Sequence, residues 1–174
     1  GMYQDLRRAC VREMIPMPFD GFAVGGLGVG EEEATLNSIG EFTAGLLPED
    51  RPRYLMGVGR PEDLIFAVRR GYDLFDCVLP TRNARNGTLF TSRGKISIKR
   101  AEFSSDPRPV DESCDCYCCR HFSRGYLRHL YLAREILAAQ LQTLHNLYFY
   151  HRLMEQCRQA IRENRTEFWL QDSE

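Results

Sequence analysis

The chain has 174 residues, and its 23 Lys and Arg against 24 Asp and Glu give a formal net charge of −1 at pH 7. Hydrophobic residues make up 43% of the sequence and charged residues 27%, which is typical of a globular protein with a core of its own. No apolar run approaches the roughly 18 residues of a membrane span, and no signal peptide is visible at the N-terminus. We therefore expect a cytoplasmic protein without a membrane partner.

The near-neutral total hides a basic segment. Residues 69–128 contain ten Arg and two Lys against seven acids, a net charge of +5. A basic segment in a neutral protein favours contact with a nucleic-acid backbone. From charge alone, a solvated arginine-rich surface remains the alternative.

The first 79 residues alternate helices and strands. Apolar spacing predicts helices over residues 3–15, 31–47 and 61–70. Short apolar runs predict strands over residues 22–24, 54–58 and 74–79. This alternation is the signature of parallel α/β units.

A glycine-rich segment, GGLGVGEEE, occupies residues 25–33. Its glycines do not fit the dinucleotide-binding pattern G-x-G-x-x-G, which would need glycine at position 31. The three glutamates would also repel a phosphate at the start of the next helix. We reject a dinucleotide site and expect the glycines either to let the backbone approach a flat ligand or to form a tight turn.

One carboxylate, Asp76, interrupts the apolar run LFDCVL at residues 74–79. An unalternated run of this length predicts a strand buried on both faces, where an ionised group must be paired or used. We expect Pro80 to end the strand and an arginine loop with Arg82 and Arg85 to come next. Two readings remain open: Asp76 acts on an anionic substrate, or it caps the next turn.

The pattern changes after residue 85. Residues 87–99 are predicted to form a β-hairpin and residues 103–112 a polar loop, and most of the chain after the cysteine cluster is predicted to be helical. Apolar residues keep helical spacing between Tyr126 and Ile161. These residues would form apolar stripes along the helices, and packing in the core is the simplest explanation of such stripes.

Seven cysteines, four of them between residues 114 and 119, do not resemble a disulfide framework and favour a metal site. Cys114, Cys116 and Cys119 form C-x-C-x₂-C, and three thiolates with one imidazole would close a structural zinc site. The candidates for that imidazole are His121, His129, His145 and His151. The remaining cysteines outside the cluster are expected to lie in the core: Cys10, Cys77 and Cys157.

Five motifs in order resemble the tRNA-guanine transglycosylase family: GGLGVGE, YLMGVG, FDCVLPTRNARNG, C-x-C-x₂-C and LHNLYFY. The resemblance runs from residue 1 to about residue 164. It implies an α/β fold, namely the C-terminal part of a TIM (β/α)₈ barrel with a zinc-binding subdomain and C-terminal helices. Its implied parts are the last β/α units of the barrel with active-site loops (residues 1–86), a hairpin and zinc-binding subdomain with a helix (87–143), and a C-terminal helix packing on the barrel (144–174).

The resemblance also implies a role for each matching residue. Asp76 matches the catalytic nucleophile, and Met56 matches the side chain that packs on the base. The rest of the base site is implied at Gly25, Gly26, Leu27 and Gly57. RNA contacts are implied at Gly57, Val58, Gly59, Arg60, Pro61, Glu62, Asp63, Thr81, Arg82, Asn83, Ala84 and Arg85. A structural Zn²⁺ is implied at Cys114, Cys116, Cys119 and His145, with Cys118 spare.

The activity implied by the resemblance is exchange of guanine at the wobble position of tRNA for a 7-deazaguanine precursor in queuosine biosynthesis. A covalent aspartyl-ribose intermediate carries the exchange. Val29, where eukaryotic members have glycine, points to the bacterial type and its aminomethyl-deazaguanine base. The implied partners are tRNA with a guanine wobble base, the deazaguanine base, and a second copy of the full-length enzyme bound through the zinc subdomain.

The sequence departs from the family in length and in a few residues. Family members are about twice as long, and their residues that read the base and accept a proton match nothing here. We therefore expect a C-terminal half that is inactive by itself. Arg60 stands where threonine is usual, and Gly28 where alanine is usual. The alternative function is a zinc-stabilised RNA-binding or assembly module without catalysis, although the retained Asp76 favours an enzyme.

Overall fold

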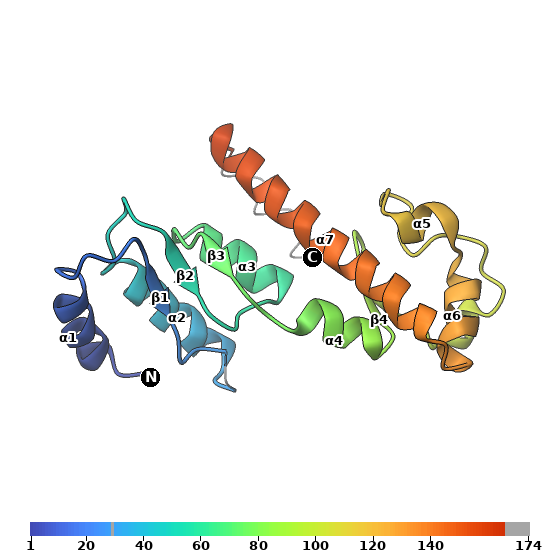
Figure 1. Cartoon of the computed structure of the whole chain (residues 1–174), viewed down its shortest axis with the longest axis horizontal. Coiled ribbons are helices and arrows are strands. Elements are labelled where there is room, and N and C mark those ends of the chain that lie inside the picture. Colours follow the sequence, from blue (N-terminus) through green and yellow to red (C-terminus); the bar gives the residue numbers. More distant parts are fainter. Residues whose placement is uncertain (29, 166–174) are drawn as a thin grey trace. The chain divides into compact units, whose positions relative to one another are not determined.

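A computed structural model describes residues 1–28 and 30–165 (Figure 1). Val29, which indicated the type of incoming base, and residues 166–174 of the predicted C-terminal segment lie outside these ranges. The described residues divide into two compact units, residues 1–78 and residues 79–165. No helix within them combines the length and the apolar character that a membrane span requires.

The described residues of the first unit form a parallel sheet with strand order β1-β2-β3, flanked by helices. Its elements are α1 (Gln4–Met14), β1 (Phe22–Val24), α2 (Glu33–Ala44), β2 (Arg53–Leu55), α3 (Pro61–Val68) and β3 (Leu74–Phe75). Phe22 pairs with Arg53, and Tyr54 pairs with Leu74. The predicted alternation of helices with parallel strands is confirmed for this part of the chain.

The core of the first unit is formed by the sheet, α2, α3 and the loops after the strands. Its buried members are Phe22, Val24, Leu27, Ile39, Ala44, Leu47, Leu55, Val58, Ala67 and Tyr72. Helix α1 contributes only partly buried side chains such as Val11 and Met14. The prediction that Cys10 lies in the core is wrong, because it is exposed on α1.

The prediction of a strand buried on both faces over residues 74–79 is also wrong. Only Leu74 and Phe75 pair with β2, and the side chains of Leu74 and Val78 are 54% and 60% exposed. Within the described residues β3 is the last strand of its sheet, so the apolar run is not enclosed. Hydrophobic composition alone does not distinguish a central strand from a terminal one.

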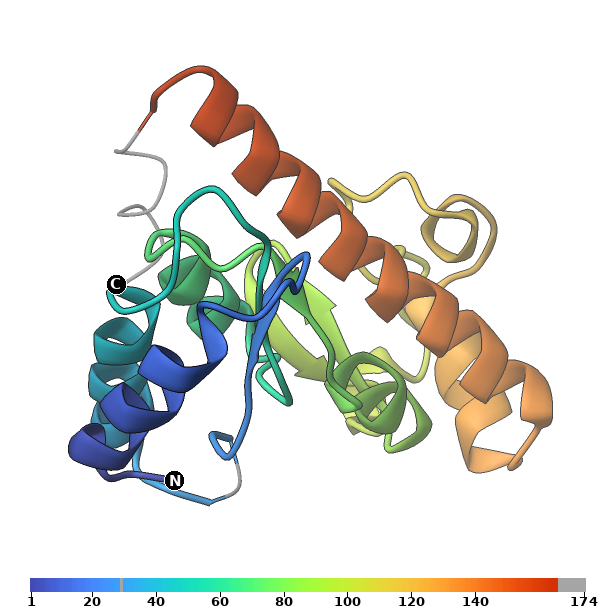
Figure 2. The same ribbon diagram turned by 60° about the vertical axis from the view of Figure 1, so that its left-hand side comes forward.

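The second unit combines a β-hairpin with helices. Its elements are α4 (Leu79–Arg85), β4 (Thr88–Thr91), β5 (Gly94–Ser97), the 3₁₀ helix η1 (Ala101–Phe103), α5 (Tyr117–His121), α6 (Arg124–Leu132) and α7 (Ile136–Arg162). Strands β4 and β5 are antiparallel with Leu89 opposite Ile96, which confirms the predicted hairpin. Helices α4, α5 and α6 and strand β4 pack along the long helix α7 (Figure 2).

The segment predicted to be an arginine loop is a helix. Helix α4 begins at Leu79, and Pro80 lies in its first turn, where a missing backbone N–H removes no helical hydrogen bond. Pro80 therefore opens a helix and does not end a strand. Arg82 and Arg85 are exposed on α4, whereas Ala84 is fully buried.

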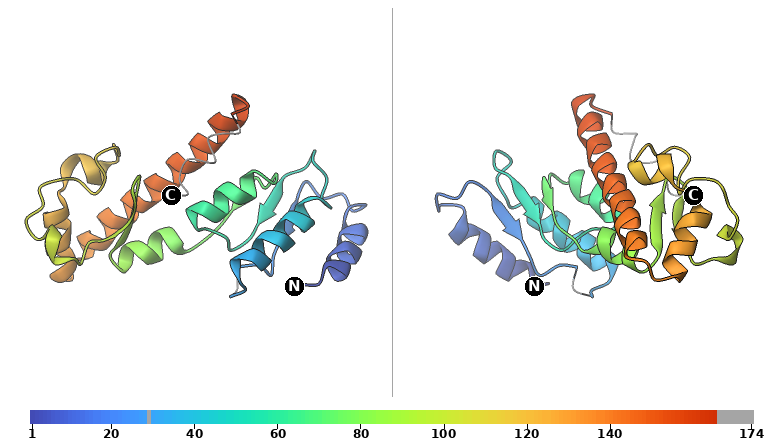
Figure 3. Two further views of the ribbon diagram at one scale, coloured as in Figure 1. Left: turned by 180° about the vertical axis from the view of Figure 1, so that it is seen from behind. Right: turned by 45° about the vertical axis from the view of Figure 1, so that its right-hand side comes forward.

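The apolar stripes of the C-terminal helices are only partly buried, so the core prediction was too broad. The chain turns at Arg134, with φ of +59°, between α6 and α7 (orange in Figure 3). Leu130 and Leu141 are buried, whereas Leu144 and Leu147 are about two-fifths exposed. A wide apolar stripe on a helix does not by itself show which part of it is covered.

Candidate catalytic site and metal centre

The carboxyl ends of the parallel strands bring together the residues predicted to bind base and ribose. Gly25 follows β1, Met56 and Gly57 follow β2, and Asp76 follows β3. The backbone N–H of Met56 donates to the carbonyl of Val24 at 3.0 Å, which joins the first two loops. Parallel α/β enzymes place their ligand sites at this edge of the sheet.

The loop after β1 needs glycine both for its backbone conformation and for its contacts. Gly26 and Gly28 have φ of +70° and +74°, a region that side chains disfavour. A Cβ on Gly28 would lie 3.0 Å from the carbonyl oxygen of Gly57, and a Cβ on Gly25 would lie 3.5 Å from Sδ of Met56. The glycine loop therefore lies against the Met56–Gly57 segment, where the side chain of Met56 is 43% exposed.

Asp76 is exposed, not buried as the apolar run predicted, and its Oδ1 accepts two hydrogen bonds. The hydroxyl of Tyr54 donates to it at 2.7 Å and the N–H of Gly57 at 3.0 Å. The bond from Tyr54, followed by that from Gly57, lowers the pKa of Asp76 below its ordinary value. Both donors reach the same oxygen, so Oδ2 of the ionised carboxylate is the oxygen that can attack an electrophile.

The hydrogen bonds of Asp76 also test the alternative interpretation, in which its side chain caps the turn that follows. Among the described residues, both donors come from β2 and the loop after it, not from the turn that follows Asp76. The carboxylate is thus held at the sheet edge. This placement favours a ligand-binding role over a capping role.

The sequence pattern did not reveal Tyr54 or Glu31 as parts of the site. Tyr54 lies between the buried residues Arg53 and Leu55, and it pairs in register with Leu74. Because side chains alternate along strands, this register places Tyr54 on the same face as Asp76, which strand alternation could have indicated. Glu31 accepts a hydrogen bond from the N–H of Gly28, so its carboxylate helps to hold the glycine loop.

Tyr54→Phe should raise the pKa of Asp76 toward the value of about 3.9 of an unperturbed aspartate. The hydrogen bond favours the charged carboxylate, so its contribution to stability is present above the unfolded-state pKa and is lost as pH falls through the lower folded-state pKa. Titration of the Asp76 carboxyl carbon by NMR measures the change. Tyr72→Phe is the control, since the Tyr72 hydroxyl donates to Gly40 at 2.9 Å. An unchanged Asp76 titration in Tyr54→Phe would contradict this account.

In the predicted RNA-contacting segment 57–63, position 59 requires glycine because its backbone closely approaches Cys77. A Cβ on Gly59 would lie 1.9 Å from Sγ of Cys77, a distance that no side chain tolerates. Cys77 is half-buried rather than fully buried, and its Sγ lies 3.8 Å from the carbonyl oxygen of Gly59. Since Cys77 directly follows Asp76, this contact keeps the loop after β2 close to the carboxylate.

Arg60, in the same segment, is surrounded by carboxylates. Its guanidinium lies 2.9 Å from Glu33, 3.4 Å from Asp63 and 3.7 Å from Glu62. The hydrogen bond to Glu33 raises the pKa of Arg60. With three acids around one base, a phosphate would have to displace ion pairs to reach Arg60.

The other predicted RNA-contacting residues lie on α4. Thr81 and Asn83 are half-buried, and Ala84 is fully buried. Arg82 and Arg85 are exposed, so they are the side chains of this helix that a ligand can reach.

The residues predicted to bind zinc form one cluster in the second unit. The ligand atoms of Cys114, Cys116, Cys119 and His145 all lie within 4.8 Å of one another. Nδ1 of His145 lies 3.9 Å from Sγ of Cys114, 3.5 Å from that of Cys116 and 3.3 Å from that of Cys119. A tetrahedral zinc site with bonds near 2.3 Å has ligand–ligand edges of about 3.8 Å, so the cluster has the size that Zn²⁺ requires.

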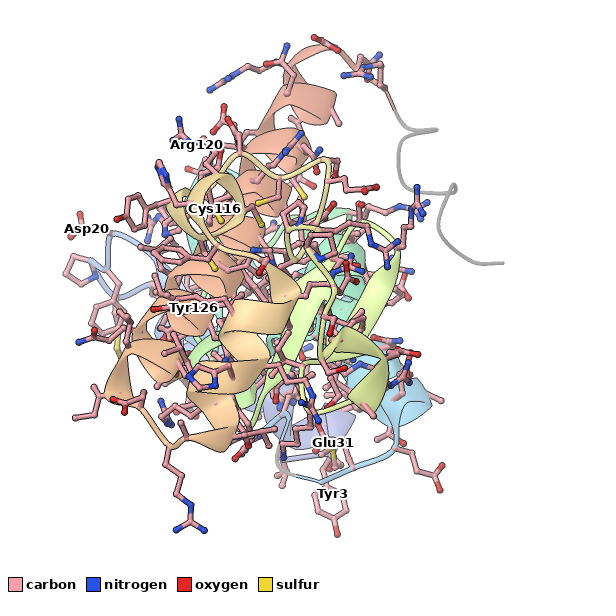
Figure 4. All side chains as sticks on the ribbon, turned by 90° about the vertical axis from the view of Figure 1, so that its right-hand side faces the viewer. Tyr3, Asp20, Glu31, Cys116, Arg120 and Tyr126 are labelled. Carbon is pink, nitrogen blue, oxygen red and sulfur yellow. The ribbon has the colours of Figure 1, made fainter. Side chains whose placement is uncertain are left out.

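Local structure explains how the ligands are held. Cys116 is the N-cap of α5 (Figure 4). Its sulfur accepts a hydrogen bond from the N–H of Cys119 at 3.3 Å. His145 is fully buried on α7, with Nε2 2.7 Å from the carbonyl oxygen of Phe90. Because a carbonyl can only accept, Nε2–H donates a hydrogen bond to it, and the unprotonated Nδ1 is left to bind a metal. In the described part of the chain, the cluster does not include His121, His129, His151 or Cys118.

The protonation of the thiols fits a divalent cation. Hydrogen bonding with Cys114, and next with Cys119, lowers the pKa of Cys116 below the ordinary value of a thiol. Hydrogen bonding with Cys114, and next with Cys116, raises the pKa of Cys119, because it stabilises the protonated thiol. One thiolate therefore forms readily, and further thiolates need the positive charge that a dication supplies.

Fold and site together define an α/β protein with a carboxylate at the carboxyl edge of a parallel sheet and a Cys₃His metal-binding cluster in a hairpin–helix unit. The chain belongs to the Queuine tRNA-ribosyltransferase family, whose family model matches residues 1–173. This confirms the family that the five motifs indicated.

Curated relatives named Queuine tRNA-ribosyltransferase are similar to this chain over 165 residues. The protein of Caldanaerobacter subterraneus subsp. tengcongensis is 59% identical, that of Solidesulfovibrio magneticus 58% and that of Actinobacillus pleuropneumoniae serotype 5b 55%. The match covers 95% of this chain and 44%, 44% and 43% of these relatives. The chain thus spans less than half the length of the curated relatives it matches.

Proposed function

We propose that this chain is the C-terminal part of a bacterial-type tRNA-guanine transglycosylase. The enzyme exchanges guanine at the wobble position of tRNA for a 7-deazaguanine precursor of queuosine. The observation that carries the proposal is the placement of Asp76, an ionised carboxylate with both donors on one oxygen at the carboxyl edge of a parallel sheet. Membership of the family supports the choice of substrate.

Asp76 performs the exchange as a nucleophile. Oδ2 attacks C1′ of the ribose while the bond from C1′ to N9 of guanine breaks, and guanine leaves with the bonding electrons and takes up a proton. N9 of the incoming base then attacks C1′, loses its own proton and releases the carboxylate. Tyr54 and Gly57 keep Oδ1 in place through both steps, so the same Oδ2 forms and leaves the ester bond.

The glycine loop and Met56 form the base site. The base leaves its stack to enter this site. Gly25, Gly26 and the peptide of Leu27 make its floor, because backbone without Cβ atoms lets a flat ring approach closely. The exposed thioether of Met56 packs on the ring, and Gly57 closes the site beside Asp76.

The RNA around the wobble base contacts residues 57–63 and 81–85. Arg82 and Arg85 supply the positive charge for these RNA contacts, because they are exposed and the segment around them is basic. They hold phosphates or the edges of unstacked bases.

Replacing Arg82 and Arg85 together with Ala should weaken RNA binding and reduce its salt dependence. Loss of two phosphate contacts should lower the slope of log affinity against log salt by about 1.4 to 2. Binding of an anticodon stem-loop over a range of salt concentrations measures the slope. Arg158→Ala is the control, because Arg158 is exposed on α7 and paired with Glu155 at 2.8 Å. A slope that stays the same in the double variant would contradict the assignment.

Zn²⁺ is the metal that we propose for Cys114, Cys116, Cys119 and His145. Three thiolates and one imidazole complete a tetrahedral shell and leave no position for a substrate, so the metal is structural. It joins α5 and the segment before it to α7, and it takes no part in the exchange.

The remaining parts of the proposal concern architecture. Residues 1–86 supply the last β/α units of a (β/α)₈ barrel, residues 87–143 the zinc subdomain, and residues 144–162 of α7 the C-terminal helix. Two copies of the full-length enzyme pair through the zinc subdomain. The enzyme acts in the cytoplasm.

A full-length chimera tests the function. In it, this chain replaces the matching 44% of the Caldanaerobacter protein. We expect the chimera to incorporate labelled guanine into tRNA, and the isolated 174 residues to incorporate none, because Asp76 cannot act as nucleophile and as proton acceptor at once. Exchange by the isolated chain would overturn the view that it is incomplete.

The second candidate is an RNA-binding or assembly module without catalysis. It is favoured by the metal cluster and the exposed arginines of the second unit, which need no Asp76. A chimera that binds tRNA but does not exchange the base, under conditions where the Caldanaerobacter protein does, would support this candidate.

A further inference from the structure

Asn146, the residue after the metal-binding His145, makes three hydrogen bonds from a fully buried position on α7. Its Oδ1 accepts from the N–H of Phe90 at 3.1 Å. Its Nδ2 donates to the carbonyl oxygen of Pro80 at 2.9 Å and to that of Thr88 at 3.0 Å. Both amide protons and the amide oxygen are therefore used, and all three partners are backbone groups.

These partners connect Asn146 to the helix that carries the exposed arginines. Pro80 lies in the first turn of α4, and Thr88 begins β4. A helix of seven residues is not stable by propensity alone, so tertiary contacts must hold it in place. The bond from Asn146 to Pro80 is such a contact, and it fixes the start of α4 against α7.

The same segment of α7 is tied to the metal cluster. His145 contacts the carbonyl oxygen of Phe90 through Nε2 at 2.7 Å, while Asn146 contacts the N–H of Phe90. Consecutive residues of α7 thus hold both backbone polar groups of one residue of β4. A metal bound to Nδ1 fixes the ring of His145 and with it the register of β4 on α7.

We propose that Asn146 is a positioning residue that couples the metal centre to α4, so that the bound metal sets how Arg82 and Arg85 are presented to RNA. The coupling itself stands on the hydrogen bonds of the second unit. Only the consequence for RNA rests on the proposed function.

The chain offers a matched control on the same helix. Gln142 lies one turn before Asn146 and is equally buried. In the described residues, neither its Nε2 nor its Oε1 has a hydrogen-bond partner. Gln142→Met therefore removes a buried amide from α7 without breaking a hydrogen bond, whereas Asn146→Leu breaks three.

Hydrogen exchange of the 174-residue chain with bound Zn²⁺ tests the coupling. In Asn146→Leu, the amides of α4 and of the turn at Asn86 and Gly87 should exchange about tenfold faster or more, with one zinc per chain retained. Removing zinc from the unmodified chain should accelerate the same amides. Gln142→Met should change neither the zinc content nor the exchange of α4.

Asn146→Asp decides the matter if Asn146→Leu does not fold. It keeps the acceptor for Phe90 and loses both donor bonds, to Pro80 and to Thr88, so faster exchange in α4 is again expected. Unchanged exchange of α4 in a zinc-loaded Asn146 variant would overturn the proposal, as would α4 exchange that does not respond to zinc removal.

Measurements of RNA binding test the proposed link to RNA separately from the coupling between the metal centre and α4. With an anticodon stem-loop, Asn146→Leu should bind more weakly and with a smaller salt slope, as the Arg82 and Arg85 double variant does. Faster α4 exchange with unchanged RNA affinity would overturn the link to RNA alone. If the unmodified chain binds no RNA, the proposed function fails, and the exchange data still decide the coupling.

Discussion

Asp76→Asn is expected to abolish base exchange by the full-length chimera, lowering the rate by at least about 10³-fold. Asparagine retains the size of the side chain and an oxygen that can accept from Tyr54 and Gly57. A neutral amide is a poor nucleophile and carries no charge to stabilise an oxocarbenium-like state. The loss should therefore fall on the chemical step and leave tRNA affinity nearly unchanged.

Trapping of the covalent intermediate gives the direct measurement. After incubation with tRNA in the absence of an incoming base, the unmodified chimera should give a protein–RNA adduct on a denaturing gel, and Asp76→Asn should give none. Asp73→Asn is the control, because Asp73 is also exposed near β3 but its Oδ2 accepts from the N–H of Arg53 at 2.8 Å. An adduct that persists in Asp76→Asn would show that another residue is the nucleophile.

The sequence could predict those parts of the site whose residues lie close together in the chain. The spacing of Cys114, Cys116 and Cys119 indicated a metal site because the three thiols lie within six residues, on the approach to α5 and in its first turns. The fourth ligand lies 26 residues beyond Cys119 on α7. Spacing left four histidines as candidates and disfavoured only His121, which lies too close to the cluster, so the choice of His145 came from the family resemblance. Which histidine meets the cluster depends on how α7 packs, and spacing carries no such information.

The parts that sequence did not predict depend on pairing between distant elements. The bond from Tyr54 to Asp76 joins residues 22 apart in the chain, and it requires the parallel register of β2 and β3. The sequence does not distinguish the helix at residues 79–85 from the end of a strand, because Pro80 suits a first helical turn as well as a strand end. Its stability comes from packing on α7 and from Asn146, whose side chain gave no local signal.

Cys119→Ser is expected to remove the bound zinc and to destabilise the second unit. A serine hydroxyl does not form the anionic ligand that a thiolate provides, and a three-ligand site binds Zn²⁺ far more weakly. The cluster is part of the core, where Cys116 and Cys119 lie with Val110 and Leu127, so metal loss also disrupts apolar packing. Structural zinc in small domains contributes on the order of 10 kcal/mol to folding, so we expect a large fall in melting temperature.

Cys118→Ser provides the comparison that identifies the ligand set. Cys118 is fully buried, and burial raises the pKa of its thiol to about 12, so it stays protonated beside the cluster. Its serine variant should retain one zinc per chain, and its melting temperature should still fall when a chelator is added. Cys119→Ser should contain no zinc and should not respond to the chelator. Because protons compete with the metal for the thiolates, zinc should also be released from the unmodified chain as pH falls. Zinc lost from Cys118→Ser but retained by Cys119→Ser would show that Cys118, not Cys119, is the third thiolate.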